Sequence, residues 1–525
     1  MAELTVGQAL VAGLKQRGVE VVFGIPGVHT VELYRGLAGS GIRHVTARHE
    51  QGAAFMADGY ARVSGKPGVA FVITGPGLTN ALTAMAQARE DSVPVLIISG
   101  VNRRASLGQG LGLLHELPDQ AGMVAKLCPS FQVTGPETLE PVLNRAFAAL
   151  ETGRPGPVHI EVPTDVMPLP AHAPRMAPAP MARAADPAQI AAAQALLAAA
   201  QRPVILAGGG CRQAEGALRA LAEALDAPVI QTSNARGLMH GHVLTVPASP
   251  SLDATRALIA ASDQILAVGT EFGPTDYDMY VRGGLPDCSG MIRVDLCADQ
   301  LARHPCRLPI QADAGTAMAA LTKGLPKVKR HGADRAAQAR QGARRELPSL
   351  SPAMPHQLQM LEAIRGAQPG ALIVGDSTQP VYAGNLFYDH DRPGGWFNAA
   401  TGFGALGFGP GAAVGAALAS PGTPVICLIG DGGLQFSPGE LRTARDEGLP
   451  ITFLVWNNAG FREIAEAMAA VDAPVLGCDP SPLRMEPFAA ACDLPFQSVE
   501  NTPEALAAAL HAPVDGPRLI EIRVS

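Results

Sequence analysis

The sequence predicts an α/β protein made of doubly wound parallel sheets. Short apolar runs alternate with helical patterns along most of the chain, as they do in successive strand–helix–strand units. Many of these runs are apolar throughout, which is typical of strands that are buried on both faces of a parallel sheet. The length of 525 residues exceeds what one hydrophobic core usually serves, so several domains are expected.

Two proline- and alanine-rich stretches divide the chain. Residues 168–187 and 325–352 show little helical or strand periodicity and are predicted to be linkers, the second with one helix near 333–346. We therefore expect three domains, at residues 1–167, 188–324 and 353–525.

Each expected domain has its own set of apolar runs, which we interpret as strands. In chain order they lie near residues 21–24, 44–47, 69–74, 95–99, 158–162, 204–207, 229–232, 264–268, 291–294, 371–374, 425–429 and 451–456.

The charge balance and the cysteine pattern exclude several classes of protein. With 40 basic and 47 acidic residues the formal net charge is −7, and no basic cluster points to nucleic acid. No apolar run is long enough to span a membrane, and the first residues lack the features of a secretory signal. Eight scattered cysteines without CxxC spacing favour reduced thiols. A cytoplasmic enzyme is the expected class.

The most informative stretch runs from residue 425 to residue 463. A buried strand ends at Gly430-Asp431-Gly432-Gly433, and a second strand ends at Asn457-Asn458. Ser437 and Glu440 between them predict a capping box at the start of a helix. Asp431 and Asn458 would then lie at the carboxyl ends of neighbouring parallel strands, where they could bind Mg²⁺ and a diphosphate. The alternative is a glycine-rich turn that an aspartate merely tightens.

Gly430-Asp431-Gly432, a spacer of 24 residues and then Asn457-Asn458 resemble the cofactor signature of thiamine-diphosphate enzymes. The resemblance covers nearly the whole chain and is greatest to the acetolactate synthase (acetohydroxyacid synthase large subunit), benzoylformate decarboxylase and pyruvate oxidase group. It implies pyrimidine-binding, central Rossmann-like and diphosphate-binding domains, in that order. It also implies thiamine diphosphate and Mg²⁺ as cofactors. The metal ligands would be Asp431, Asn458 and the carbonyl of Gly460, with Gly432 and Gly433 beside the diphosphate.

Glu50 takes the position of the family's catalytic glutamate, in the segment from Arg48 to Arg62. A carboxyl group that is hydrogen-bonded to N1′ of the aminopyrimidine promotes the tautomer that removes the C2 proton of the cofactor. In the family this glutamate comes from the partner subunit. The resemblance therefore implies a homodimer at least, and we expect a homotetramer with active sites at subunit interfaces. The alternative for Glu50 is an acidic residue that only complements a helix N-terminus.

Further positions match cofactor contacts of the family. The loops that follow predicted strands supply them: Pro26, Gly27, Asn80, Ser377, Thr378, Gln379, Gly404 and Leu406. Leu406 takes the position of the apolar residue that keeps the cofactor bent. Each loop could also be an ordinary tight turn, and Leu406 could be ordinary core.

The substrate side departs from acetolactate synthase. Leu114-His115 replaces a Phe-Gln pair, and Glu463 and Ala467 replace a Met and a Trp. The arginine that receives the acceptor keto acid is missing from Thr270–Thr275, and FAD is not expected in the central domain. His29 and His115 are candidates for proton transfer, although a lone histidine is more often structural.

These observations predict thiamine-diphosphate-dependent decarboxylation of a 2-oxo acid, followed by carboligation of the enamine to a carbonyl acceptor. One alternative is a decarboxylase that releases an aldehyde, or a 2-hydroxyacyl-CoA lyase. Another is a relative that binds the cofactor without turnover, and the presence of Glu50, Asp431 and Asn458 counts against it. The hypothesis of a nicotinamide oxidoreductase is supported only by Gly208–Gly210, which is not a complete dinucleotide motif.

Overall fold

A computed structural model of the chain describes residues 4–178, 183–279, 283–513 and 515–524. The chain divides into two compact units. The first comprises residues 1–180, 402–498 and 513–525, and the second comprises residues 181–401 and 499–512.

The N-terminal part of the first unit is a parallel sheet with the order β3-β2-β4-β5-β7-β6. The strands are β2 (Val21–Gly24), β3 (Arg43–Thr46), β4 (Gly68–Val72), β5 (Val95–Val101), β6 (Ser130–Gln132) and β7 (Pro157–Pro163). The chain order reverses between β2 and β4. Such a switch point opens a crevice beyond the carboxyl ends of the two strands, where ligands bind in folds of this type.

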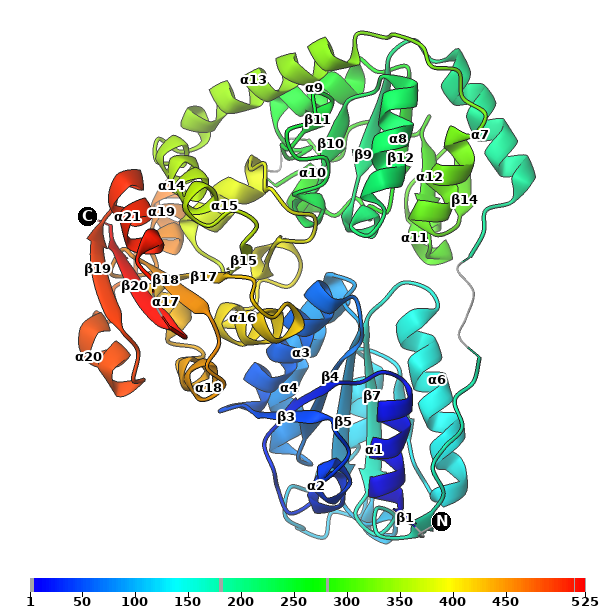
Figure 1. The fold of residues 1–525 in the computed structure, drawn as a ribbon, viewed down its shortest axis with the longest axis vertical. Helices are drawn as coiled ribbons and strands as arrows, with labels where there is room; N and C mark the ends of the chain where they lie inside the picture. The colour runs from blue at the N-terminus through cyan, green and yellow to red at the C-terminus, as the bar shows by residue number, and fades with distance from the viewer. Residues whose placement is uncertain (1–3, 179–182, 280–282, 514, 525) are drawn as a thin grey trace. The chain divides into compact units, whose positions relative to one another are not determined.

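Helices cover both faces of this sheet (Figure 1), so its inner strands β2, β4, β5 and β7 are buried. One face carries α1 and α6, and the other carries α3 and α4. The helices are α1 (Val6–Gln16), α2 (Val31–Leu37), α3 (Glu50–Ser64), α4 (Pro76–Glu90), α5 (Gln120–Ala125) and α6 (Leu139–Glu151). A short antiparallel pair, β1 (Leu4–Thr5) with β8 (Pro170–Ala171), ties the end of this part back to its beginning.

The C-terminal part of the first unit has a second set of parallel strands, in which β18 pairs with both β17 and β20. Its strands are β17 (Val425–Gly430), β18 (Ile451–Asn457) and β20 (Arg518–Arg523), and β19 spans Phe496–Glu500. Its helices are α16 (Phe408–Ala419), α17 (Asp431–Leu434), α18 (Glu440–Asp446), α19 (Arg462–Ala470) and α20 (Met485–Ala491).

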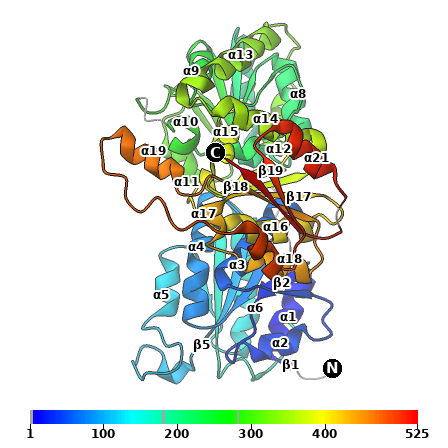
Figure 2. The same cartoon turned by 90° about the vertical axis from the view of Figure 1, so that its left-hand side faces the viewer.

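Helix α3 lies directly against α16 and close to α18 (Figure 2). Glycines allow the two long helices to approach backbone to backbone. A Cβ atom on Gly59 would lie 2.0 Å from the carbonyl oxygen of Ala412, and one on Gly415 would lie 1.9 Å from that of Met56. Because nothing larger than glycine fits, α3 and α16 are held as one rigid pair.

The second unit contains a parallel sheet with the order β11-β10-β9-β12-β13-β14, the doubly wound arrangement. Its strands are β9 (Pro203–Ala207), β10 (Val229–Gln231), β11 (Thr245–Val246), β12 (Gln264–Val268), β13 (Ile292–Asp295) and β14 (Leu308–Gln311). Its helices are α7 (Pro187–Ala199), α8 (Glu215–Leu225), α9 (Asp253–Ala260), α10 (Pro274–Tyr277), α11 (Ala298–Arg303) and α12 (Ala314–Thr322). The unit also holds β15 (Leu372–Gly375), which pairs in parallel with β16 (Trp396–Asn398), together with α13 (Gly332–Leu350), α14 (Met354–Ala367), α15 (Gln379–Leu386) and α21 (Pro503–His511).

The predicted fold class is confirmed, and every predicted strand overlaps an observed one. Strands β1, β6, β8, β11 and β16 were missed because runs of two or three residues give no periodicity, and β14, β19 and β20 were missed because polar residues interrupt their apolar runs. The two predicted linkers are partly structured: β8 lies in the first, and the whole of α13 lies in the second, where one helix was expected. Residues 179–182 of the first linker lie outside the described residues.

The capping box at Ser437 is wrong. Helix α18 begins at Glu440, and the Ser437 hydroxyl donates to the carbonyl oxygen of Gly407 (2.7 Å) instead of capping a helix.

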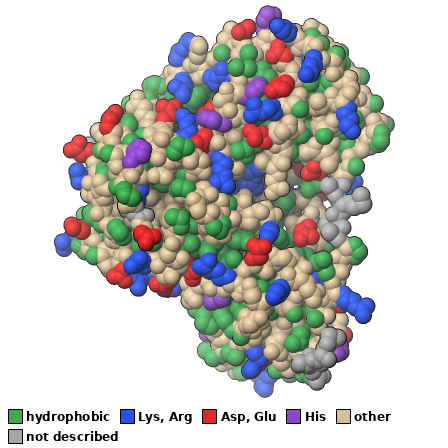
Figure 3. Space-filling view, viewed as in Figure 1, with side chains coloured by type: hydrophobic (Ala, Val, Ile, Leu, Met, Phe, Trp, Pro, Cys, Tyr) green, Lys and Arg blue, Asp and Glu red, His purple; other side chains and the backbone are tan. Residues whose placement is uncertain are grey.

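Basic and acidic side chains are interspersed over the face shown in Figure 3. In the part of the chain that the structure describes, no helix combines the length and the apolar composition needed to cross a bilayer.

Candidate active site

Asp431 and Asn458 come together as predicted. Asp431 is the first residue after β17, Asn458 directly follows β18, and the two strands are neighbours in register. The Asn458 amide donates to Oδ1 of Asp431 at 3.4 Å, and Asp431 is buried. Burial raises the pKa of Asp431, and backbone hydrogen bonds from Asn458 and Gly460 oppose that shift. The carboxylate therefore lies in a desolvated place where a nearby cation would stabilise it.

The glycines of this cluster are required by close contacts. A Cβ atom on Gly432 would lie 2.5 Å from the ring of Phe461. Gly460 has a φ of +157°, and a Cβ atom on it would lie 2.6 Å from the Cys478 carbonyl oxygen. Arg462 at the start of α19 donates from Nε to the Asn458 carbonyl oxygen at 3.0 Å, which ties α19 to the cluster.

The donor set suits Mg²⁺ with a diphosphate. One carboxylate, one side-chain amide and one carbonyl are all oxygen donors, and Mg²⁺ is commonly held by one or two carboxylates plus phosphate oxygens. Within the described residues no group of three or more His, Cys, Asp and Glu side chains could hold a metal ion. The residues present therefore fit a metal whose remaining ligands come from a phosphate.

Glu50 lies in a second cluster, built from α3 and α4. Its Oε2 accepts a hydrogen bond from Nδ2 of Asn80 at 3.0 Å. Gly77, one turn earlier on α4, lies beside the carboxylate, and a Cβ atom there would lie 2.7 Å from the Ile73 side chain. The structure thus brings together two of the residues that the sequence singled out.

The loop after β2 closes on the loop after β4 at the switch point of the sheet. A Cβ atom on Gly27 would lie 2.4 Å from the Ile73 side chain, and Pro26 beside it is exposed. The candidate residues Pro26 and Gly27 therefore line the crevice where this sheet class binds ligands.

His29 and His115 contact each other. Their ring centroids are 5.4 Å apart and the rings are nearly perpendicular, at 83°. Nδ1 of each ring is buried, as is the Thr74 hydroxyl, and none of these atoms has a hydrogen-bond partner among the described residues. Burial, and the proximity of His115, lower the pKa of His29. His115 itself has a φ of +61°, a strained backbone that its surroundings must hold in place.

Glu440 is a buried carboxylate whose role sequence reasoning missed. Its Oε1 accepts from the backbone amides of Arg48 (3.2 Å) and His49 (3.1 Å), the two residues before Glu50. Its Oε2 accepts from the Thr443 hydroxyl at 2.8 Å. Burial raises its pKa, and these hydrogen bonds oppose the shift. Glu440 thus holds the start of the Glu50 helix from the C-terminal part of the same unit.

The turn that carries Gly404 and Leu406 is also held by the N-terminal part. The Ala405 amide donates to Oε1 of Gln87 at 3.1 Å, and Nε2 of Gln87 donates to Asp91 at 2.6 Å. Asp91 in turn accepts from the buried Arg62 at 2.7 Å. Gly404 is exposed with a φ of +74°, and Leu406 is half-buried.

Ser377, Thr378 and Gln379 follow β15 in the second unit. The buried Thr378 precedes the first residue of α15, and the Ser377 amide donates to Oδ1 of Asp376 at 2.9 Å. This places all three at the carboxyl end of a parallel strand, as expected.

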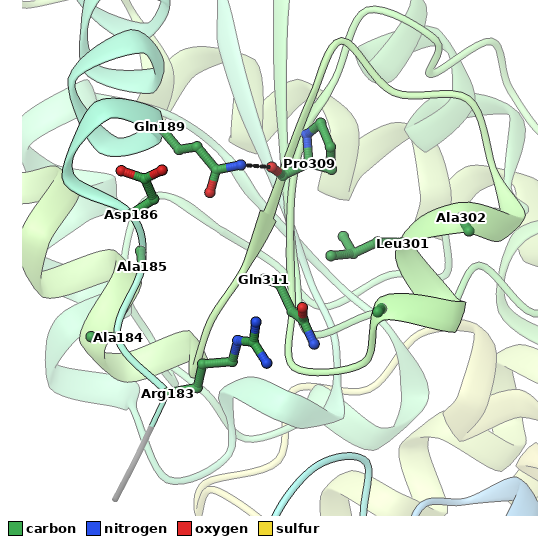
Figure 4. A pocket seen from close by; sticks show the side chains of 10 residues that line it. Arg183, Ala184, Ala185, Asp186, Gln189, Leu301, Ala302, Pro309 and Gln311 are labelled. Carbon is green, nitrogen blue, oxygen red and sulfur yellow. Dashed lines mark hydrogen bonds between the residues drawn. The ribbon is translucent and has the colours of Figure 1, made fainter.

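Two cavities are lined by none of the candidate residues. One of about 660 Å³ lies in the second unit, between the start of α7, α11 and β14 (Figure 4). It is lined by Arg183, Asp186, Gln189, Leu301 and Gln311, among others, and by none of the candidate residues. Another, of about 530 Å³, lies within the loop of residues 108–118 that leads to His115.

The glycines Gly208–Gly210 have a packing role. A Cβ atom on Gly208 would lie 2.1 Å from the Gly269 carbonyl oxygen, and one on Gly210 would lie 2.9 Å from the Cα atom of Gly269. The loops after β9 and β12 therefore meet backbone to backbone, which accounts for the glycine run without a dinucleotide.

Three family models match the chain in succession. They are the thiamine pyrophosphate enzyme N-terminal binding domain at residues 4–123, the central domain at residues 190–321 and the C-terminal binding domain at residues 376–522.

Named relatives cover most of the chain. The Probable 2-ketoarginine decarboxylase AruI of Pseudomonas aeruginosa is 44% identical over 485 residues, covering 91% of this chain and 86% of that protein. The acetolactate synthase isozyme 1 large subunit of Escherichia coli is 32% identical over 472 residues, covering 86% and 82%.

A solved structure shares the fold. The X-ray structure of a proposed thiamin diphosphate-dependent enzyme from Mycobacterium smegmatis aligns with a TM-score of 0.83 over 99% of both chains, at 23% identity. From the matched domains and these relatives, the chain belongs to the thiamine pyrophosphate enzyme family and is a thiamine-diphosphate-dependent enzyme of the 2-oxo acid type.

Proposed function

We propose that this enzyme decarboxylates a 2-oxo acid and releases the aldehyde. The observation that carries the proposal is the contact of His29, on the loop after β2, with His115, in the same part of the chain as Glu50 on α3. Replacement of CO₂ by a proton requires a group that delivers one proton to the reacting carbon, and imidazole is suited to that task near neutral pH.

The residues described above fit the cofactor. When bound, thiamine diphosphate supplies a nucleophilic carbon that adds to the 2-oxo group and takes up the electrons released with CO₂. Asp431, Asn458 and the Gly460 carbonyl would hold Mg²⁺ and the diphosphate. Glu50, oriented by Asn80, would hold the aminopyrimidine through its carboxyl group. Leu406 and Gly404 would complete the cofactor site in this unit.

The histidine pair would carry the proton. Burial and the neighbouring His115 disfavour a charge on His29, so the pair resists holding two protons at once. A proton carried by one ring can be given to the product carbon and replaced from solvent. Thr74, whose buried hydroxyl lies between the two loops, would orient the substrate.

The site needs two copies of the chain in this proposal. Glu50 and Asp431 belong to clusters formed by different elements, and apolar side chains near both clusters are exposed, including Val28 (69%), Leu114 (63%) and Phe436 (56%). We propose a homodimer in which Glu50 of one chain serves the Asp431 cluster of its partner. A homotetramer stays a prediction.

The relatives and the charge on α19 support a guanidino 2-oxo acid as the proposed substrate class. The relative named for 2-ketoarginine is 44% identical, whereas those named as acetolactate synthases are 30–32% identical. Exposed Glu463 and Glu466 lie on α19, which Arg462 ties to Asn458. A carboxylate on this helix is suited to the cationic end of a guanidino 2-oxo acid.

Carboligation is the second candidate because several relatives are named as acetolactate synthases. The two fates differ in what reaches the reacting carbon after CO₂ leaves: a proton gives an aldehyde, and a carbonyl acceptor gives a ketol.

The test is CO₂ release from 2-ketoarginine, its neutral ureido analogue and pyruvate, with thiamine diphosphate and Mg²⁺ present or omitted and with products identified. We expect cofactor-dependent release and aldehyde formation, fastest with 2-ketoarginine and lost in Asp431→Asn. A ketol as the main product would replace the proposal by carboligation. No release from any acid by protein that binds the cofactor would overturn it.

A further inference from the structure

A single buried amide, that of Gln120, joins the two glycines, Gly75 and Gly100, that pack against the backbones of the candidate histidines. Gln120 is the first residue of α5 and is 3% exposed. Its Oε1 accepts from the Gly75 amide at 3.0 Å, and its Nε2 donates to the Gly100 carbonyl oxygen at 2.9 Å. Because a backbone amide can only donate and a carbonyl can only accept, these two contacts set the orientation of the side-chain amide.

The backbone of His115 packs against Gly75, and the backbone of His29 packs against Gly100. Gly75 has a φ of +65°, and a Cβ atom on it would lie 2.5 Å from the His115 carbonyl oxygen. A Cβ atom on Gly100 would lie 2.8 Å from the His29 carbonyl oxygen and 3.0 Å from the Thr74 hydroxyl. One side chain therefore bridges the Gly75–His115 contact and the Gly100–His29 contact.

Gln120 is itself held by a buried polar network. Its Nε2 lies 3.0 Å from Oε2 of Glu161 and 3.1 Å from the Ser99 hydroxyl. The other oxygen of Glu161 accepts from Gln132 at 2.7 Å, and Ser99 bonds His159 at 2.8 Å. A network satisfied at this many points holds a side chain in one rotamer, as a positioning group requires.

We infer that Gln120 is a positioning residue, which sets the spacing and facing of the His29 and His115 rings through the Gly75 and Gly100 backbones. The inference rests on the proposed function for what the rings do, but the positioning itself is a claim about the folded chain. Gln120 does not act as a proton donor, since a carboxamide does not titrate.

The chain offers a matched control. Gln132 is also a glutamine that donates to Glu161, but it lies on β6 and this hydrogen bond does not involve Gly75 or Gly100. Gln120→Met keeps the volume of the side chain and removes the hydrogen bonds to Gly75 and Gly100. Gln132→Met removes one hydrogen bond to Glu161. Gln120→Glu is a second variant, which keeps an acceptor for Gly75 and loses the donor to Gly100.

The activity test compares kcat, KM and the pH profile of the three variants. We expect Gln120→Met to lower kcat by up to about 10²-fold, the scale of a misplacement near 1 Å, with a smaller change in KM. The pH profile and the aldehyde-to-ketol ratio should shift as well. Gln132→Met should change none of these. Gln120→Glu should fall between the two.

The titratable groups that could contribute to such a profile lie on several elements. They are His29, His115, Glu50 on α3, Glu116 on the loop before α5, Asp119, and His159 and Glu161 on β7. The variants His29→Asn and His115→Asn identify which limb of the pH–activity profile depends on the histidine pair.

A second readout does not need activity. In the full-length protein with ¹³C-labelled histidine, NMR titration should show altered His29 and His115 resonances in Gln120→Met and wild-type resonances in Gln132→Met. If both variants keep the wild-type resonances and the wild-type kcat, Gln120 is only structural and the inference is wrong. If the wild-type chain releases no CO₂, the proposed function fails, and the NMR result alone still decides the positioning role.

Discussion

Glu463 and Glu466 lie one turn apart on α19, and both are exposed. Exposed ion pairs contribute about 0–1 kcal/mol, so a substrate guanidinium held by one of them should gain a few-fold in affinity. We predict that Glu463→Gln raises the KM for 2-ketoarginine by about 2- to 5-fold with little change in kcat. The KM for the neutral ureido analogue should not change.

Glu466→Gln is the control for this prediction, because it removes the same charge from the same helix one turn further from Asn458. If the two variants change KM equally, the helix attracts the substrate through its overall negative charge and Glu463 makes no specific contact with the guanidinium.

His159 provides a prediction at the residue scale that concerns stability. It is fully buried between the hydroxyls of Ser99 and Ser130, and burial lowers its pKa from 6.5 to about 3. Below pH 6.5 the unfolded chain binds a proton at His159, whereas in the folded chain His159 stays neutral. The free energy of unfolding should therefore be constant above that pH and fall below it, by about 2 kcal/mol at pH 5 from this group alone.

Urea unfolding of wild type and His159→Gln between pH 5 and pH 8 measures this effect. The variant should be less stable at pH 8 and should lose less stability on acidification. Parallel curves for the two proteins would assign the acid sensitivity to other groups.

At the scale of elements, the crossing of α3 and α16 places Glu50 and the cofactor turn on one rigid support. Glycine is required there because the two backbones touch at Gly59 and Gly415. Overpacking of a tight core typically costs about 1–3 kcal/mol. We predict that Gly59→Ala lowers the free energy of unfolding by that amount and also lowers cofactor-dependent activity.

Gly366→Ala serves as the matched control in a urea titration. Gly366 lies inside α14, and a Cβ atom there would meet nothing within 4 Å. Alanine is the better helix former, so this variant should gain about 0.5–1 kcal/mol. Similar losses for both variants would contradict the packing argument.

Buried charges connect the same elements. Glu440 reaches the amides before Glu50, and Gln87 with Asp91 reaches the turn at Ala405. Each link joins residues that are more than 300 positions apart in the chain. Local pattern therefore could not predict them, and the pattern around Ser437 and Glu440 even pointed to the wrong partner.

At the scale of the whole molecule, the proposed dimer can be tested by mixing inactive chains. Glu50→Gln and Asp431→Asn damage different clusters. If each site combines Glu50 of one chain with Asp431 of the other, a mixed dimer has one site with neither substitution. Random exchange makes half of the dimers mixed, so a 1:1 mixture should recover about a quarter of wild-type activity.

Mixing each variant with itself is the control for this experiment and should recover nothing. No recovery in the 1:1 mixture, with chain exchange shown by mass spectrometry, would mean that both residues act within one chain.

The sequence by itself was enough for the fold class, for the strands with continuous apolar runs and for the Asp431–Asn458 pair. These depend on local periodicity and on loops that follow neighbouring strands, and both are visible in a short window of sequence. It also singled out His29 and His115, but not that their rings touch. The contact of the two rings, the bridge made by Gln120 and the hold of Glu440 on the Glu50 helix were decided by tertiary structure alone. Each depends on side chains from separate elements meeting in a desolvated interior, where hydrogen bonds must be satisfied by whatever groups the fold brings within reach.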